Sequence, residues 1–164
     1  MNGAWNGPVC GRVTGWDQAT SDERRLWVKL LTEALRVSRA GYDEDAVTLI
    51  RLLGLTLGPD AVTGSLVYLA DRAASPWLAS PAGPDEVIGV VVMDDETGRQ
   101  ADIEELPYPV RWAARMVAAA ANRDYEVVHA LIGAALDDGR MDACIAVLTQ
   151  MAASVPAPAG AVRV

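Results

Sequence analysis

Apolar residues recur every three or four positions along most of this chain of 164 residues, the spacing that lines one face of an α-helix. The first such stretch opens with a capping box, because Thr20 is followed three residues later by Glu23, and it runs to about Ala40. Gly41 then favours the left-handed conformation that commonly ends a helix. The pattern predicts a mainly α fold.

Two further helices are expected in the first half of the chain. Asp43 is a suitable cap for the second helix, which precedes the break at Gly58-Pro59-Asp60. The third is expected to end at Ser75-Pro76, because proline disfavours helical geometry in the residue before it. Residues 21–78 therefore form a predicted unit of three helices, and residues 79–84 a linker without helical period.

The same order returns in the second half. A helix is expected over residues 110–121, followed by Asn122, which tolerates the left-handed conformation, and by Asp124 as the next cap. That helix ends near Gly139, and a last helix completes a second predicted unit over residues 110–154. Either an internal duplication or a shared composition rich in alanine and leucine explains the similarity of the two units.

A valine-rich run, residues 87–93, interrupts the helical pattern and is predicted to be the first strand of a β-hairpin within residues 79–109. The expected turn is Asp94-Asp95-Glu96-Thr97-Gly98, and the expected return strand is the mostly polar run 99–103. Both faces of the first strand are apolar: one carries Val87, Val91 and Met93, and the other carries Ile88, Val90 and Val92.

Something must cover a hairpin that is apolar on both faces, because two isolated strands are only marginally stable in water. Either the helices of the same chain cover it, or a strand of a second copy or of another protein does so, or no hairpin forms. We take Ile88, Val90 and Val92 as candidate partner-binding residues. The acidic tip, Asp94, Asp95 and Glu96, would then steer a basic surface toward them.

The net charge of -8 is concentrated in the predicted hairpin region. Residues 85–105 carry eight acidic side chains and one basic side chain, whereas the remainder of the chain is close to neutral. This region should repel duplex DNA. An alternative nucleic-acid contact is a basic stripe on the first helix, which consists of Arg25, Lys29, Arg36 and Arg39 on the side opposite the leucines. A solvated outer face explains the stripe better, because Asp22 and Glu33 at its edge dilute the positive potential.

The ends of the chain lack a hydrophobic period, so residues 1–20 are expected to form a flexible arm and residues 155–164 a disordered tail. Cys10 and Cys144 have no partner at metal-ligand spacing, which favours a reducing, cytoplasmic location. The sequence shows neither a secretory signal nor a membrane segment.

No phosphate-binding, dinucleotide or zinc motif is found, and the single histidine, His129, has no evident nucleophile nearby in the sequence. We therefore predict no cofactor, no metal site and no catalytic residue. The favoured function is a small protein–protein interaction module, an adaptor or regulator that forms a homodimer. The first alternative is a nucleic-acid-binding transcriptional regulator that uses the basic stripe. The second is an enzyme or small-ligand protein with its site between the two units, which an enclosed, carboxylate-lined pocket near His129 would favour.

Overall fold

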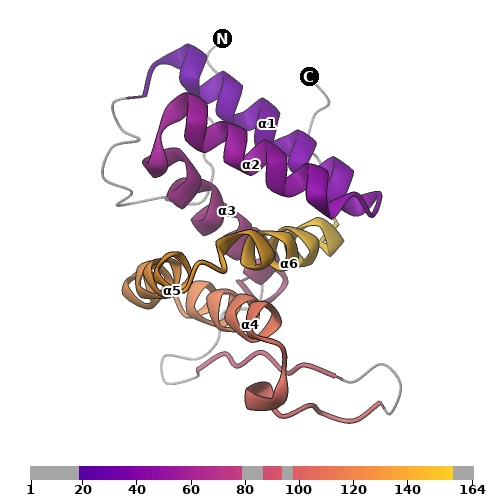
Figure 1. Ribbon diagram of the computed structural model, residues 1–164. Coiled ribbons are helices and arrows are strands. Elements are labelled where there is room, and N and C mark those ends of the chain that lie inside the picture. The colour runs from indigo at the N-terminus through magenta and orange to yellow at the C-terminus, as the bar shows by residue number, and fades with distance from the viewer. Residues whose placement is uncertain (1–18, 79–86, 94–97, 157–164) are drawn as a thin grey trace.

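A computed structural model of the chain describes residues 19–78, 87–93 and 98–156 (Figure 1). Within these residues the chain forms six α-helices and one short 3-10 helix. They are α1 (Ser21–Arg39), α2 (Asp43–Leu57), α3 (Pro59–Leu78), η2 (Ile103–Glu105), α4 (Tyr108–Ala121), α5 (Tyr125–Asp137) and α6 (Met141–Ser154). The prediction of a mainly α fold is confirmed.

Helices α3 and α6 lie at the centre of the molecule. In Figure 1, α1 and α2 lie side by side at the top and α4 lies below, with α3 descending between them. Helix α6 packs mainly against α1, α2, α3 and α4, and it also contacts α5. The buried side chains form one cluster that draws on all six helices, so the two predicted helical units share a core. Their origin by duplication stays a prediction.

Local sequence signals set several helix ends. The capping box at the start of α1 is confirmed: the Thr20 hydroxyl accepts the Glu23 N–H at 3.2 Å, and the Glu23 carboxylate accepts the Thr20 N–H at 2.7 Å. At the start of α5, the Asp124 carboxylate accepts the Val127 N–H at 3.2 Å, as predicted for a cap. These bonds satisfy N–H groups that have no partner within the helix.

Three helices end in the same arrangement, the Schellman motif, around a residue with positive φ. After α1 this residue is Gly41 (φ 87°), and after α5 it is Gly139 (φ 64°). After α4 the left-handed residue is Arg123 (φ 57°), whereas Asn122, expected there, has φ -87°. The helix ends at Ala121 as expected, but Asn122 is its cap and keeps a negative φ, so the left-handed position falls one residue later, at Arg123.

Two predicted boundaries differ from the structure. Asp43 is the first residue of α2 rather than its cap, because its carboxylate accepts hydrogen bonds from Ser38 on α1 and Gln150 on α6, each at 2.8 Å. Helix α3 continues through Pro76 to Leu78. A proline so close to the helix end costs little, because it removes one hydrogen bond of the last turn.

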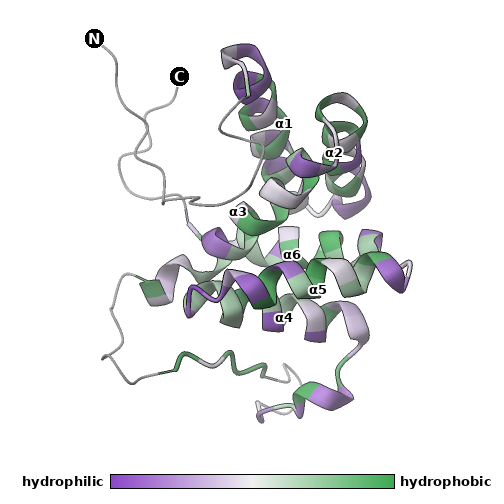
Figure 2. Ribbon diagram, turned by 90° about the vertical axis from the view of Figure 1, so that its left-hand side faces the viewer, coloured by the Kyte–Doolittle hydropathy of each residue, from purple (hydrophilic) through white to green (hydrophobic). Residues whose placement is uncertain are grey.

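The predicted β-hairpin is wrong. The described residues contain no strand; residues 87–93 and 98–102 are linked by one isolated antiparallel bridge, between Met93 and Gln100, and by a 2.9 Å bond from the Ala101 N–H to the Val92 carbonyl. The expected turn residues 94–97 lie outside the described residues. Figure 2 shows residues 87–93 as an extended, mostly hydrophobic segment beside α4.

A side chain takes the hydrogen bonds that a neighbouring strand would have made. The Asn122 amide, at the end of α4, accepts the Ile88 N–H at 2.9 Å and donates to the Ile88 carbonyl at 2.8 Å. On the return path, Asp102 accepts the Glu104 N–H at 3.0 Å and starts η2, so extended pairing stops there. These contacts hold the segment on its own helices without a second strand.

Candidate functional site

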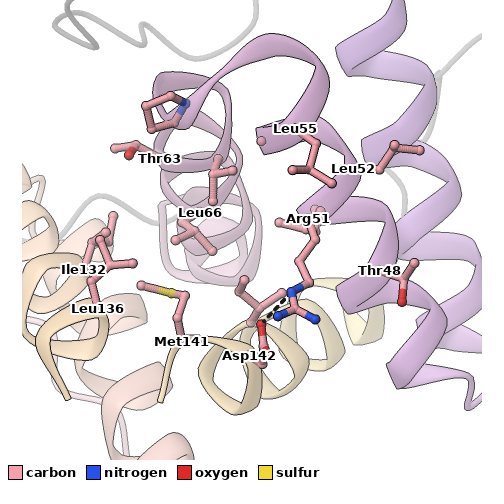
Figure 3. Close-up of a pocket in the computed structure, with 15 residues that line it drawn as sticks. Thr48, Arg51, Leu52, Leu55, Thr63, Leu66, Ile132, Leu136, Met141 and Asp142 are labelled. Carbon is pink, nitrogen blue, oxygen red and sulfur yellow. Dashed lines mark ion pairs between the residues drawn. The ribbon is translucent and has the colours of Figure 1, made fainter. Parts of the chain in front are cut away.

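A groove of about 800 Å³ opens where α2, α3, α5 and α6 meet (Figure 3). Its walls are mainly aliphatic, with Leu52 and Leu55 from α2, Leu66 from α3, and Ile132 and Leu136 from α5. These helices belong to both halves of the sequence. The groove therefore exists only once the two halves have packed together.

Helix α2 lines the groove because it is apolar on two sides. Ile50 and Leu53 are fully buried in the core, whereas Leu52 and Leu55 follow a different side of the same helix. Leu55 is 86% exposed. Apolar residues on a second side of a helix need a second covering surface. Leu52 and Leu55 are therefore the sequence signal that could have located this groove.

The end of the groove is shaped by a close crossing of α2 and α3. A Cβ atom on Gly54 of α2 would lie 2.8 Å from the Cγ2 atom of Val62 on α3, closer than a real Cβ contact allows. Gly54 therefore permits the close approach of the two helices. Both residues line the groove, so this crossing sets the position of one wall relative to the other.

One ion pair lies at the mouth of the groove. Arg51 of α2 and Asp142 of α6 approach to 3.2 Å, and both side chains are more than half exposed. Such an exposed pair contributes little to stability. Among the described residues that line the groove there is no histidine, cysteine or glutamate. The lining therefore suits binding of aliphatic groups better than acid–base chemistry.

The basic stripe of α1 is largely engaged within the chain. Arg25 lies 3.3 Å from Asp22, and the Arg36 guanidinium donates two hydrogen bonds to Glu33. The exposed Lys29 forms no ion pair with another described residue. Neighbouring carboxylates thus reduce the positive potential available for a phosphate backbone.

Arg39, the fourth member of the stripe, has a structural role. Its guanidinium donates two hydrogen bonds, of 3.0 and 2.8 Å, to the Ala153 carbonyl at the end of α6. Carbonyls at a helix C-terminus lack partners within the helix and carry partial negative charge, which favours a cation there. No observation favours the nucleic-acid alternative.

The valine-rich segment has the two faces predicted from its alternation. Ile88, Val90 and Val92 are half-buried, and the first two pack against the core, whereas the other face is exposed, with Val87 85% exposed. A second cavity of about 630 Å³ lies between this segment, α4 and α5. Binding of a partner by Ile88, Val90 and Val92 stays a prediction, and Asp94, Asp95 and Glu96 lie outside the described residues.

The other titratable candidates do not form a catalytic arrangement. His129 is exposed on α5, outside both cavities. Cys144 is fully buried, and burial raises the pKa of its thiol to about 11, so it is protonated at neutral pH. Burial also raises the pKa of Asp71, whose carboxylate accepts a hydrogen bond from the Tyr125 hydroxyl at 3.1 Å. Each group is explained by packing.

Comparisons with known proteins add no assignment, since no family model, no curated protein and no solved structure matches the chain. Within the described ranges, no cluster of three or more histidine, cysteine, aspartate or glutamate side chains could hold a metal ion. Among the described helices, none has the length and hydropathy needed to cross a membrane. The groove is therefore the feature on which a functional proposal rests.

Proposed function

We propose that this chain is a protein–protein interaction module, an adaptor or regulator that receives an apolar helix face of another protein in the groove between α2, α3, α5 and α6. The observation that carries the proposal is the group of uncovered leucines around that groove. Leu55 is 86% exposed, Leu136 60% and Leu52 43%, and all three line one concave surface. Large apolar side chains gathered at one concave site favour a binding role over isolated surface exposure.

The size of the apolar surface favours a macromolecular partner over a small ligand. A small molecule within the cavity would leave the outer sides of Leu55 and Leu136 in contact with water. An amphipathic helix laid along the groove would cover both the cavity and these leucines. The segment of α2 from Thr48 to Leu55 spans about 10 Å at the rise of an α-helix, enough for two turns of a partner helix.

The proposal can be tested with three synthetic amphipathic peptides of about 14 residues. All three carry the same leucine face, and their polar face is lysine, glutamine or glutamate. We expect at least one to bind the wild-type chain in a fluorescence anisotropy titration. Leu55→Asp should weaken that binding by about tenfold or more, because covering a leucine stabilises a complex by about 1.5–3 kcal/mol.

The matched control is Val28→Asp. Val28 is also an exposed apolar residue, 49% accessible, but it lies on α1 outside the groove. This variant should bind like the wild type, and both variants should keep the wild-type melting temperature because neither residue is buried. The proposal fails if none of the peptides binds, or if Leu55→Asp and Val28→Asp weaken binding equally.

The homodimer predicted from the sequence is a separate proposal, with light scattering of the free chain as its test. A monomeric mass across the micromolar range would exclude a stable homodimer. It would leave the proposed binding of another protein intact.

A further inference from the structure

We infer that the helix received by the groove is basic, with lysine or arginine side chains flanking its aliphatic face. This inference rests on the proposed function and adds the charge of the partner. Within the groove itself, Arg51 and Asp142 neutralise each other at 3.2 Å. We call the exposed residues next to the lining the rim of the groove. The charged side chains among them decide which charge a bound partner meets.

These neighbouring residues are acidic on three of the four helices. On the fourth, α6, the exposed Arg140 precedes Met141, but its guanidinium lies over the Tyr108 ring, 4.9 Å from the ring centre. Asp45 lies one turn before Thr48 on α2, Asp60 directly follows Pro59 on α3, and Asp137 directly follows Leu136 on α5. All three are exposed. Within the described parts of the chain, no ion pair joins any of the three to a basic side chain. Their charge is available to a partner.

The position of Asp137 is informative because the helix itself does not favour it. Asp45 and Asp60 lie in the first turns of their helices, where the helix dipole stabilises a negative charge. Asp137 is the last residue of α5, whose final turn contains no basic side chain. A carboxylate at that end is repelled by the helix dipole. A cationic group from a partner would relieve this repulsion.

Other occupants fit the rim less well. A second copy of the chain would bring the same acidic rim against Asp45, Asp60 and Asp137, which costs free energy because like charges meet. Residues 1–18 of the same chain carry one arginine and one aspartate, so they offer no excess of positive charge. A basic helix of another protein complements both the aliphatic floor and the acidic rim.

The test compares the same three peptides. At about 50 mM salt we expect the lysine peptide to bind most tightly, the glutamine peptide next, and the glutamate peptide about tenfold or more weaker than the lysine peptide, since several exposed charge pairs contribute. The difference should shrink at about 0.5 M salt, where screening shortens the reach of each charge to a few ångströms. The unmodified chain suffices for this measurement.

Charge reversal at the rim locates the effect. The double variant Asp45→Lys, Asp137→Lys should lose the preference for the lysine peptide. The matched control, Asp22→Lys with Glu33→Lys on α1, changes the net charge equally and should keep the preference. If the three peptides bind the groove with equal affinity, the inference of a basic partner is overturned and the proposed function stands. Equal effects of the two double variants on the preference for the lysine peptide would also overturn the inference. If no peptide binds, both fail. Self-association that blocks the groove would identify a second copy as the occupant and also overturn the inference.

Discussion

Replacing Arg72 by alanine should destabilise the C-terminal end of α6 and, through it, the whole core. The Arg72 guanidinium, on α3, donates hydrogen bonds to the carbonyls of Ala152 at 3.0 Å and Val155 at 2.9 Å. Neither carbonyl can find a partner in a further turn, because α6 ends at Ser154. Since α6 packs against all five other helices, the Arg72 side chain ties the last turn of α6 to the core.

The magnitude follows from the two bonds and their environment. A hydrogen bond from a charged group contributes about 1.5–3 kcal/mol, and the lower end applies here because Arg72 is half-buried. We expect Arg72→Ala to lower the free energy of unfolding by about 2–3 kcal/mol. Arg39→Ala should cost less, about 1–2 kcal/mol, because both of its hydrogen bonds reach the single carbonyl of Ala153.

Urea unfolding followed by circular dichroism measures these losses directly. For a chain of this size, a loss of 2–3 kcal/mol should lower the melting temperature by about 5–10 °C. Arg25→Ala is the control, because its pair with Asp22 is exposed and should contribute less than about 0.5 kcal/mol. A change in stability for Arg72→Ala no larger than that of Arg25→Ala would refute the reasoning.

Three further outcomes are expected. Asn122→Ala should speed hydrogen exchange at the Ile88 amide, which loses its acceptor. The melting temperature should stay nearly unchanged, because the lost hydrogen bonds are exposed. An unchanged exchange rate would contradict the anchoring role of Asn122. Asp71→Asn should stabilise the chain more at pH 7 than at pH 3. Burial raises the pKa of Asp71 in the folded state. The wild type therefore has its full stability below the unfolded-state pKa of Asp71 and loses stability as the pH rises through the folded-state pKa. Parallel pH profiles of stability for variant and wild type would contradict this. In a Cys10→Ser background, alkylation of Cys144 at pH 8 should accelerate with urea as the chain unfolds; rapid alkylation of the folded chain would contradict its burial.

The helices could be predicted because their signals are local. The capping box at Thr20 and the cap at Asp124 act on N–H groups three residues away, so the sequence contains the whole interaction. The hairpin failed for the opposite reason. Alternating valines led to the prediction of a strand, but the segment forms none, and its backbone at Ile88 is bonded by the side chain of Asn122, 34 residues away.

The groove could not be predicted from any one segment, because four helices from both halves of the chain form it. Its only local trace is the second apolar side of α2, with Leu52 and Leu55. The positions of the basic stripe on α1 were readable from the sequence, but the role of one of its residues was not. Helical spacing placed its four side chains on one side of the helix, but only the packing of α6 against α1 shows that Arg39 holds the Ala153 carbonyl.

The most direct test of groove binding is a methyl NMR titration of the chain with the lysine peptide. The groove account predicts that the largest shift changes occur at the methyl groups of Leu52, Leu55 and Leu136, with little change at Val28 on α1 or Val91 in the extended segment. Changes centred on Val91 or Val28, with the three leucines unaffected, would contradict it.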